Sequence, residues 1–278
     1  MSVTVMLGGT SEQISPAIQT GIHYAKRLGT NLTGLCAMPD PSTTAVYIAG
    51  AETVTLGASA IASMTEAQDK LAKNLEAVFV EHTKSAGAWL TAQFERKTGS
   101  VALHGAARAS LSDALILPKE ATDSGHTLNP VFEHVLMEAH LPLVLSPTKA
   151  KVSDTCVIAW DGSPLAARAI KMHLPLIETY KMVLIAENPD KIRHQWEPVC
   201  RDSKARLTDL LHQSRVQVKQ VTFEGAVSDG LQKVASDYDA SLIVMGAFVH
   251  NRLGQMLFGG TTSRLLHNGD SPALALCH

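Results

Sequence analysis

Short runs of apolar and β-branched residues alternate along the chain with longer segments in which apolar residues recur at helical spacing. Val3–Leu7, Asn31–Met38 and Thr155–Trp160 have the length and composition of buried strands. Met64–Ser85 places its apolar residues on one stripe and its charged residues on the opposite side, as a helix packed on one face does. Regular alternation of strands and helices predicts doubly wound parallel sheets with helices on both faces.

The same two patterns continue along the rest of the chain. We expect further strands at Ala88–Glu95, Ser112–Leu117, Leu141–Ser146, Lys181–Ala186, Val216–Phe223 and Ala240–Met245. We expect further helices from Ser15-Pro16 to Leu28, over His104–Ser110 and Pro130–His140, from Pro164 onward, and over Arg201–Ser214 and Ser228–Tyr238. Thr43–Ser63 has no clear period, so we expect a connection without regular structure there.

The second half of the chain repeats the order of the first half. Pro189-Asp190 ends a strand as Pro39-Asp40 does, and Leu265–Leu276 parallels Val135–Leu145. A repeat of about half the chain is too long for a solenoid unit and suits a whole domain. The sequence therefore predicts two copies of one α/β fold, residues 1–148 and 152–278, joined by a short polar segment.

Composition and charge exclude several classes of protein. The chain of 278 residues is 45% apolar and 18% charged with a formal net charge of -2, so it has no electrostatic footprint for nucleic acid or an anionic membrane. The four cysteines form no CxxC pair and suit buried thiols in a reducing compartment. Without a run long enough to span a bilayer or a basic N-terminal region, the sequence predicts a cytoplasmic protein.

A glycine-bearing loop separates the strand that ends at Met245 from the helical spacing that begins at Leu265. Such a loop can turn several backbone N–H groups toward one point, and the positive end of the next helix adds to their field. Gly246, Gly259 and Gly260 suit positions that need positive φ or close approach to a ligand. The stretch therefore indicates a phosphate site.

The loop resembles the signature of the universal stress protein family, which is glycine, two residues, glycine, nine residues, glycine and a small hydroxyl residue. Gly246 and Gly259 fill the first and third glycine places, whereas Val249 stands at the second. Thr261 and Thr262 follow Gly260, which occupies the hydroxyl place. The two threonines can bind phosphate, although capping of the helix explains them equally well.

The resemblance covers the whole chain and is stronger from Thr155 onward. It implies two Rossmann-like domains of the adenine nucleotide alpha hydrolase type, which stand in for the family's homodimer within one chain. The last strands, Leu141–Ser146 and Pro272–Cys277, would then pair antiparallel. The resemblance also implies that the second domain binds ATP or AMP with Mg²⁺, and that the protein is a monomer with an internal pseudo-dimer or a homodimer.

The resemblance assigns further contacts to the turn after Trp160. Asp161, followed by Gly162 and Ser163, takes the place of the family's acidic residue near the adenosine, although capping of the helix at Pro164 accounts for Asp161 and Ser163 equally well. The backbone of Ala186 would meet the adenine edge. Gly8 stands at the place of Asp161 in the first half, so we expect no nucleotide there.

Val249 leaves two functions open, because a β-branched residue at positive φ is costly and must change the loop path or narrow the phosphate site. The first hypothesis is a nucleotide-responsive stress protein with at most slow ATP hydrolysis. The alternative is a nucleotide-free scaffold for stress-response partners. Adenylyl transfer ranks last because the HxGH-like and PP-loop motifs are absent, and no catalytic residue or metal site is predicted, since the sequence lacks HExxH, GxSxG and GxxxxGK[ST] motifs.

Overall fold

The computed structural model describes residues 2–43, 58–192, 197–214, 216–247, 264–265 and 271–278. The strands of the N-terminal half are β1 (Ser2–Met6), β2 (Asn31–Met38), β3 (Ala92–Thr98), β4 (Ala114–Pro118) and β5 (Leu143–Ser146). Those of the C-terminal half are β6 (Thr155–Ala159), β7 (Met182–Glu187), β8 (Gln217–Thr222), β9 (Leu242–Gly246) and β10 (Ala273–Cys277).

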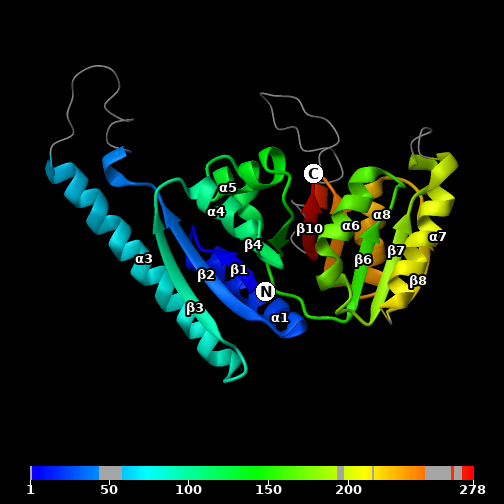
Figure 1. Ribbon diagram of the computed structural model, residues 1–278, viewed down its shortest axis with the longest axis horizontal. Helices are drawn as coiled ribbons and strands as arrows, with labels where there is room; N and C mark the ends of the chain where they lie inside the picture. The colour runs from blue at the N-terminus through cyan, green and yellow to red at the C-terminus, as the bar shows by residue number, and fades with distance from the viewer. Residues whose placement is uncertain (1, 44–57, 193–196, 215, 248–263, 266–270) are drawn as a thin grey trace, which may run out of the picture.

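The strands form one sheet with the order β3-β2-β1-β4-β5-β10-β9-β6-β7-β8, which runs across the whole molecule (Figure 1). Read outward from the centre, the two halves have the same strand order, and all neighbours within each half are parallel. At the centre β5 and β10 pair antiparallel, with Leu145 opposite Leu274 and Leu143 opposite Leu276. This pairing confirms the one implied by the resemblance, and it leaves neither strand as an open sheet edge.

Helices cover both faces of the sheet, and the predicted fold class is confirmed. The helices are α1 (Ser11–Leu28), α3 (Ala58–Ala86), α4 (Val101–Ala109), α5 (Asn129–Glu133), α6 (Pro164–Ile177), α7 (Glu197–Gln213) and α8 (Val227–Asp237). One core cluster joins α1, α3, α6 and α7 to the sheet, and a second joins α4, α5 and α8 to its other face. Because both faces are covered, the central strands are continuous apolar runs.

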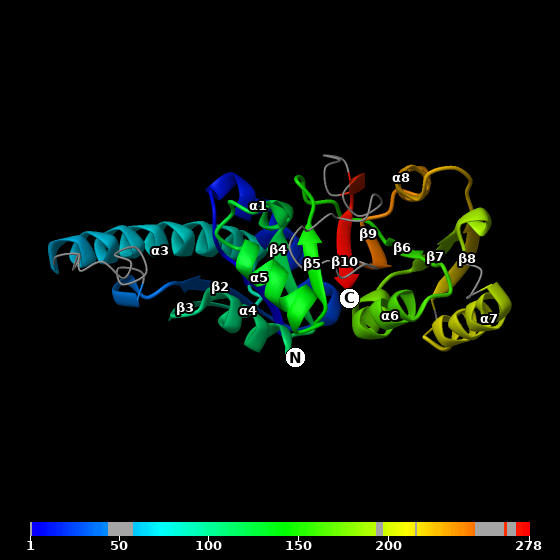
Figure 2. The same ribbon diagram turned by 90° about the horizontal axis from the view of Figure 1, so that it is seen from above.

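Short helical segments complete the description. A π-helical segment, η2 (His134–Glu138), continues α5, and 3₁₀ turns lie at η1 (Lys119–Thr122) and η3 (Pro189–Lys191). At one end of the molecule α3 extends well beyond the sheet (Figure 2). Within the described parts of the chain, no helix is both long and apolar enough to cross a membrane. The domain boundary between residues 148 and 152 stays a prediction.

The start of α1 differs from the prediction. The helix begins at Ser11 rather than at Ser15, and Pro16 lies inside it. Thr10 precedes the helix, and its backbone N–H donates to Gln13 Oε1 at 2.9 Å, so a capping residue one turn earlier satisfies a helix-start donor. The Ser-Pro pair was a weaker start signal than this Thr10 and Gln13 pair.

Two elements of the N-terminal half also lie elsewhere than predicted. Helix α3 starts at Ala58, so the irregular connection predicted over Thr43–Ser63 is wrong for its last residues, while residues 44–57 lie outside the described part. Strand β3 starts at Ala92 instead of Ala88. Trp89, which looked like strand sequence, is exposed in the preceding turn, where its indole N–H donates to Ala86 O at 2.6 Å.

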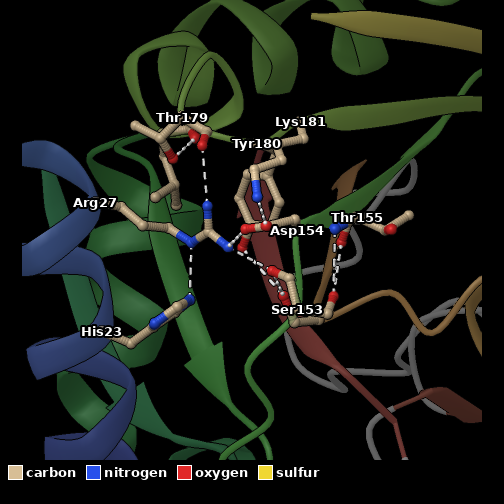
Figure 3. A network of polar contacts seen from close by, with 10 residues as sticks. His23, Arg27, Ser153, Asp154, Thr155, Thr179, Tyr180 and Lys181 are labelled. Atoms are coloured by element: carbon tan, nitrogen blue, oxygen red, sulfur yellow. Dashed lines mark hydrogen bonds and ion pairs between the residues drawn. The ribbon is translucent and has the colours of Figure 1, made fainter.

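Arg27 on α1 joins the N-terminal half to the C-terminal half (Figure 3). Its guanidinium donates to Thr179 O at 2.9 Å, to Ser153 O and to Asp154 Oδ1 at 2.9 Å. Its Nε–H donates to His23 Nε2 at 2.8 Å, and the guanidinium carbon lies 4.2 Å from the ring centre of Tyr180. One side chain therefore fixes the segment before β6 and the segment after α6 against α1.

Candidate functional site

The candidate site lies where the strand order of the C-terminal half reverses. From β6 the chain moves outward to β7 and β8, and it then returns to β9 on the opposite side of β6. In open α/β sheets, ligands bind beyond the carboxyl ends of the strands at such a switch point. Asp161 follows β6 and Gly246 ends β9, so both predicted residues lie at this point.

The turn after β6 is organised by hydrogen bonds that cap α6. Asp161 Oδ1 accepts from the backbone N–H of Ser163 at 3.0 Å, and Ser163 Oγ accepts from the backbone N–H of Ala166 at 3.2 Å. Gly162 has a φ of +76°, a region that favours glycine. The capping interpretation is therefore correct for Asp161 and Ser163, and Asp161 Oδ2 takes no part in these contacts.

Gly246 is required by close packing against the first turn of α6. A Cβ atom at this position would lie 2.9 Å from Leu165 C, 2.9 Å from Leu165 Cβ and 3.0 Å from Ala166 N. The end of β9 thus lies directly beside the helix that Ser163 caps. The structure brings Asp161, Gly162, Ser163 and Gly246 together at one edge of the sheet.

Replacing Gly246 with alanine should lower the free energy of unfolding by about 1–2 kcal/mol, because the added methyl group overlaps backbone atoms of α6 that cannot rotate away. Urea unfolding without nucleotide measures this change. Gly125→Ala is the matched control, since a Cβ atom at Gly125 meets nothing within 4 Å. Equal stability of the two variants would contradict a packing role for Gly246.

Ala186 lies beside the same turn. Its carbonyl accepts from the backbone N–H of Trp160 at 2.8 Å, and its side chain is buried. The remaining predicted contacts fall on Gly259, Gly260, Thr261 and Thr262, which lie outside the described residues together with Val249. Their part in the site stays a prediction.

Two side chains at this edge were not predicted as site residues. The sequence placed Trp160 only at the end of a strand and did not single out Glu187, yet both are buried and each carries a polar atom without a hydrogen-bond partner. The other carboxylate oxygen of Glu187 accepts from Lys204 Nζ at 2.5 Å. A glutamate directly after the apolar run of β7 was the one sequence signal that could have identified this buried charge.

In the N-terminal half, the turn after β1 packs closely against the segment after β4. A Cβ atom on Gly8 would lie 2.9 Å from Leu128 Cγ and 3.0 Å from Thr127 Oγ1, and one on Gly9 would lie 2.7 Å from His126 Nε2. Burial lowers the pKa of His126. The segment after β4 therefore packs against the turn after β1. The expectation that this half binds no nucleotide stays a prediction.

Other features of the described residues do not add chemistry to the crevice. No group of three or more histidine, cysteine, aspartate or glutamate residues within them is arranged to hold a metal ion. A cavity of about 480 Å³ lies between α8 and the segment that starts at Arg264. Its described lining contains none of the predicted site residues.

Comparison with known proteins gives one family model and several solved structures of similar fold. Residues 153–276 match the model of the universal stress protein family. The crystal structure of a universal stress protein from Archaeoglobus fulgidus is similar over 99% of this chain and 97% of that chain, with a TM-score of 0.65 and 11% sequence identity. A Pseudomonas aeruginosa structure described as a universal stress protein is similar over 99% of this chain and 92% of that chain, with a TM-score of 0.50 and 14% identity. At such identities the likeness concerns the fold alone, and no curated protein matches the sequence.

Proposed function

Residues 153–276 match the model of the universal stress protein family, and from this match we propose that the protein is a stress-response module whose C-terminal half binds ATP or AMP. The observation that supports binding most directly is the crevice at the strand-order switch, where the Asp161–Ser163 turn packs beside Gly246. A carboxylate, a helix N-terminus and a glycine-bearing loop entry meet there. This combination suits a ribose and a chain of phosphates.

The proposal assigns a role to each part of the crevice. Asp161 Oδ2, which capping leaves unused, accepts from a ribose hydroxyl group, while the N-terminus of α6 faces the negative charge of the ligand. Gly259, Gly260, Thr261 and Thr262 supply backbone N–H and hydroxyl groups to the phosphates, with Mg²⁺ as the counter-ion of ATP. In this proposal the phosphates are the main ligands of that ion.

The N-terminal half has a different task in this proposal. Thr127 and Leu128 pack against Gly8 at the place that corresponds to Asp161, and in this proposal the N-terminal half serves as the fixed partner across the β5–β10 pair. We propose that residues 1–148 and 152–278 are the two domains and that the first contributes structure rather than binding. Occupancy of the second then changes the surface presented to a protein partner.

Nucleotide binding should appear as a rise in thermal stability, because a ligand that binds only the folded state stabilises it by RT ln(1 + [L]/Kd). We expect millimolar ATP or AMP to raise the unfolding temperature, and Val249→Gly to increase the rise by restoring the glycine of the signature. Asp161→Asn keeps an oxygen for capping but removes the charge, and it should reduce the rise. Asp209→Asn, an exposed position on α7, is the matched control.

A nucleotide-free scaffold is the second candidate, and Val249 is the observation that favours it. In that case neither wild-type protein nor the Val249→Gly variant gains stability with ATP, AMP or Mg²⁺. A gain restricted to the variant would mean that the crevice is competent and that Val249 has closed it. Unchanged stability of both proteins would therefore contradict the binding proposal.

A further inference from the structure

Two buried polar atoms without a partner lie at the carboxyl ends of β6 and β7, next to the predicted site residues. They are Trp160 Nε1 and Glu187 Oε2, on residues that are only 5% and 8% exposed. The indole N–H can only donate a hydrogen bond, and an ionised carboxylate oxygen can only accept one. Burial of either group without a partner is costly. The pair is therefore complementary to a ligand that offers one acceptor and one donor.

The backbone places these two residues on neighbouring strands. Ala159 is in register with Ala186, and the N–H of Trp160 donates to Ala186 O at 2.8 Å, so Trp160 continues the ladder beside Glu187. The Trp160 side chain belongs to the same core cluster as Ile158 and Ile185. Because side chains alternate along a strand, Glu187 lies on that same face of the sheet. Both residues also adjoin predicted site residues, Asp161 and Ala186.

The Glu187 carboxylate is held in place from its other oxygen. Lys204 Nζ on α7 donates to Oε1 at 2.5 Å, and the two side chains are 21% and 10% exposed for Lys204 and Glu187. The lysine supplies the counter-charge, and Oε2 is buried without a hydrogen-bond partner. A fixed carboxylate with one free oxygen is suited to accept from a neutral N–H group.

We propose that Trp160 Nε1 and Glu187 Oε2 form a side-chain subsite that recognises the edge of a purine base. Adenine presents a ring nitrogen acceptor next to its exocyclic amino donor, so Trp160 donates to the ring nitrogen and Glu187 accepts from the amino group. The inference rests on the proposed nucleotide binding and adds to it the part of the site that distinguishes the base. A bound base would supply a hydrogen-bond partner to each of the two unpaired atoms.

The test compares AMP, N6,N6-dimethyl-AMP and ribose 5-phosphate by calorimetry. Trp160 is replaced with β-(3-benzothienyl)alanine, which has nearly the shape of tryptophan but lacks the N–H, and Glu187 is replaced with glutamine in a second variant. We expect each change to weaken AMP binding about tenfold. Binding of ribose 5-phosphate should not change. N6,N6-dimethyl-AMP has lost the amino donor, so it should bind the wild-type protein more weakly than AMP does. The wild-type protein and the Glu187→Gln variant should bind N6,N6-dimethyl-AMP with equal affinity.

The same variants separate failure of this inference from failure of the proposed function. If wild-type protein binds AMP and the benzothienyl variant binds it equally well, the subsite is wrong while nucleotide binding stands. If wild-type protein binds no AMP, the proposed function fails and the subsite fails with it. The unfolding temperature without ligand is the folding control, because an N–H with no internal partner can be removed without loss. A marked fall in that temperature would show that Trp160 has a partner within the protein and would overturn the inference.

Discussion

Replacing Arg27 with methionine should lower the free energy of unfolding by about 2–4 kcal/mol, because a buried guanidinium that donates to two backbone carbonyl oxygens is lost. The Arg27 side chain is only 9% exposed. Its loss removes the Arg27 donor from Thr179 O and from Ser153 O, which also accepts from Ser241 Oγ at 3.2 Å, and it removes the cation above the Tyr180 ring. Urea unfolding followed by circular dichroism measures the change.

Two control variants separate the stability that comes from the hydrogen bonds of the guanidinium group from the stability that comes from its charge. Arg27→Lys keeps the charge, but a lysine ammonium group lacks the planar set of donors that contacts Thr179, Ser153 and Asp154. The stability of this variant should therefore lie between those of the wild-type protein and Arg27→Met. Asp154→Asn should cost less than about 1 kcal/mol, because the Asp154 side chain is 48% exposed. A loss of the same small size in Arg27→Met would show that the two halves do not depend on this residue.

Much of the fold could be predicted from the sequence, because the chain repeats its own strand pattern. Asn31–Met38 was predicted with the bounds that β2 has, since its apolar run ends at a proline-containing turn. The errors occurred where local signals competed. Trp89 and Leu90 suit a strand, but they lie in a turn in which Leu90 N–H donates to Gly87 O at 3.3 Å. Strand β3 therefore begins later in the sequence than predicted. The antiparallel centre of the sheet came from the family resemblance and not from periodicity.

The candidate site was predictable only where its residues are close in sequence. The types and spacing of Asp161 and Ser163 predict a helix cap, and the structure contains that cap. Two features depend on how distant segments pack together: Leu128 lies against Gly8, and Trp160 Nε1 is buried without a partner. Neither leaves a periodic pattern in the sequence. Residue type shows what a side chain can donate or accept, but only the packed chain shows whether a partner is present.

Acidification should destabilise the protein through His173, which is buried on α6. One ring nitrogen, Nε2, lies 3.1 Å from Leu276 O on β10, and the other, Nδ1, is buried without a partner. Burial lowers the pKa of His173 from 6.5 to about 4. Since the folded chain holds His173 neutral while the unfolded chain takes up a proton below pH 6.5, stability is complete above that pH and declines until about pH 4.

The expected loss from His173 between pH 6.5 and about 4 is about 3 kcal/mol, since each unit of pKa shift corresponds to about 1.4 kcal/mol. His23 adds to the loss in the same direction, because burial and the charge of Arg27 lower its pKa to about 4 as well. Urea midpoints measured across this range give the slope. In His173→Gln the amide can still donate to Leu276 O but does not titrate, so the variant should lose less stability on acidification. Parallel curves for the two proteins would mean that His173 is not the group that takes up the proton on unfolding.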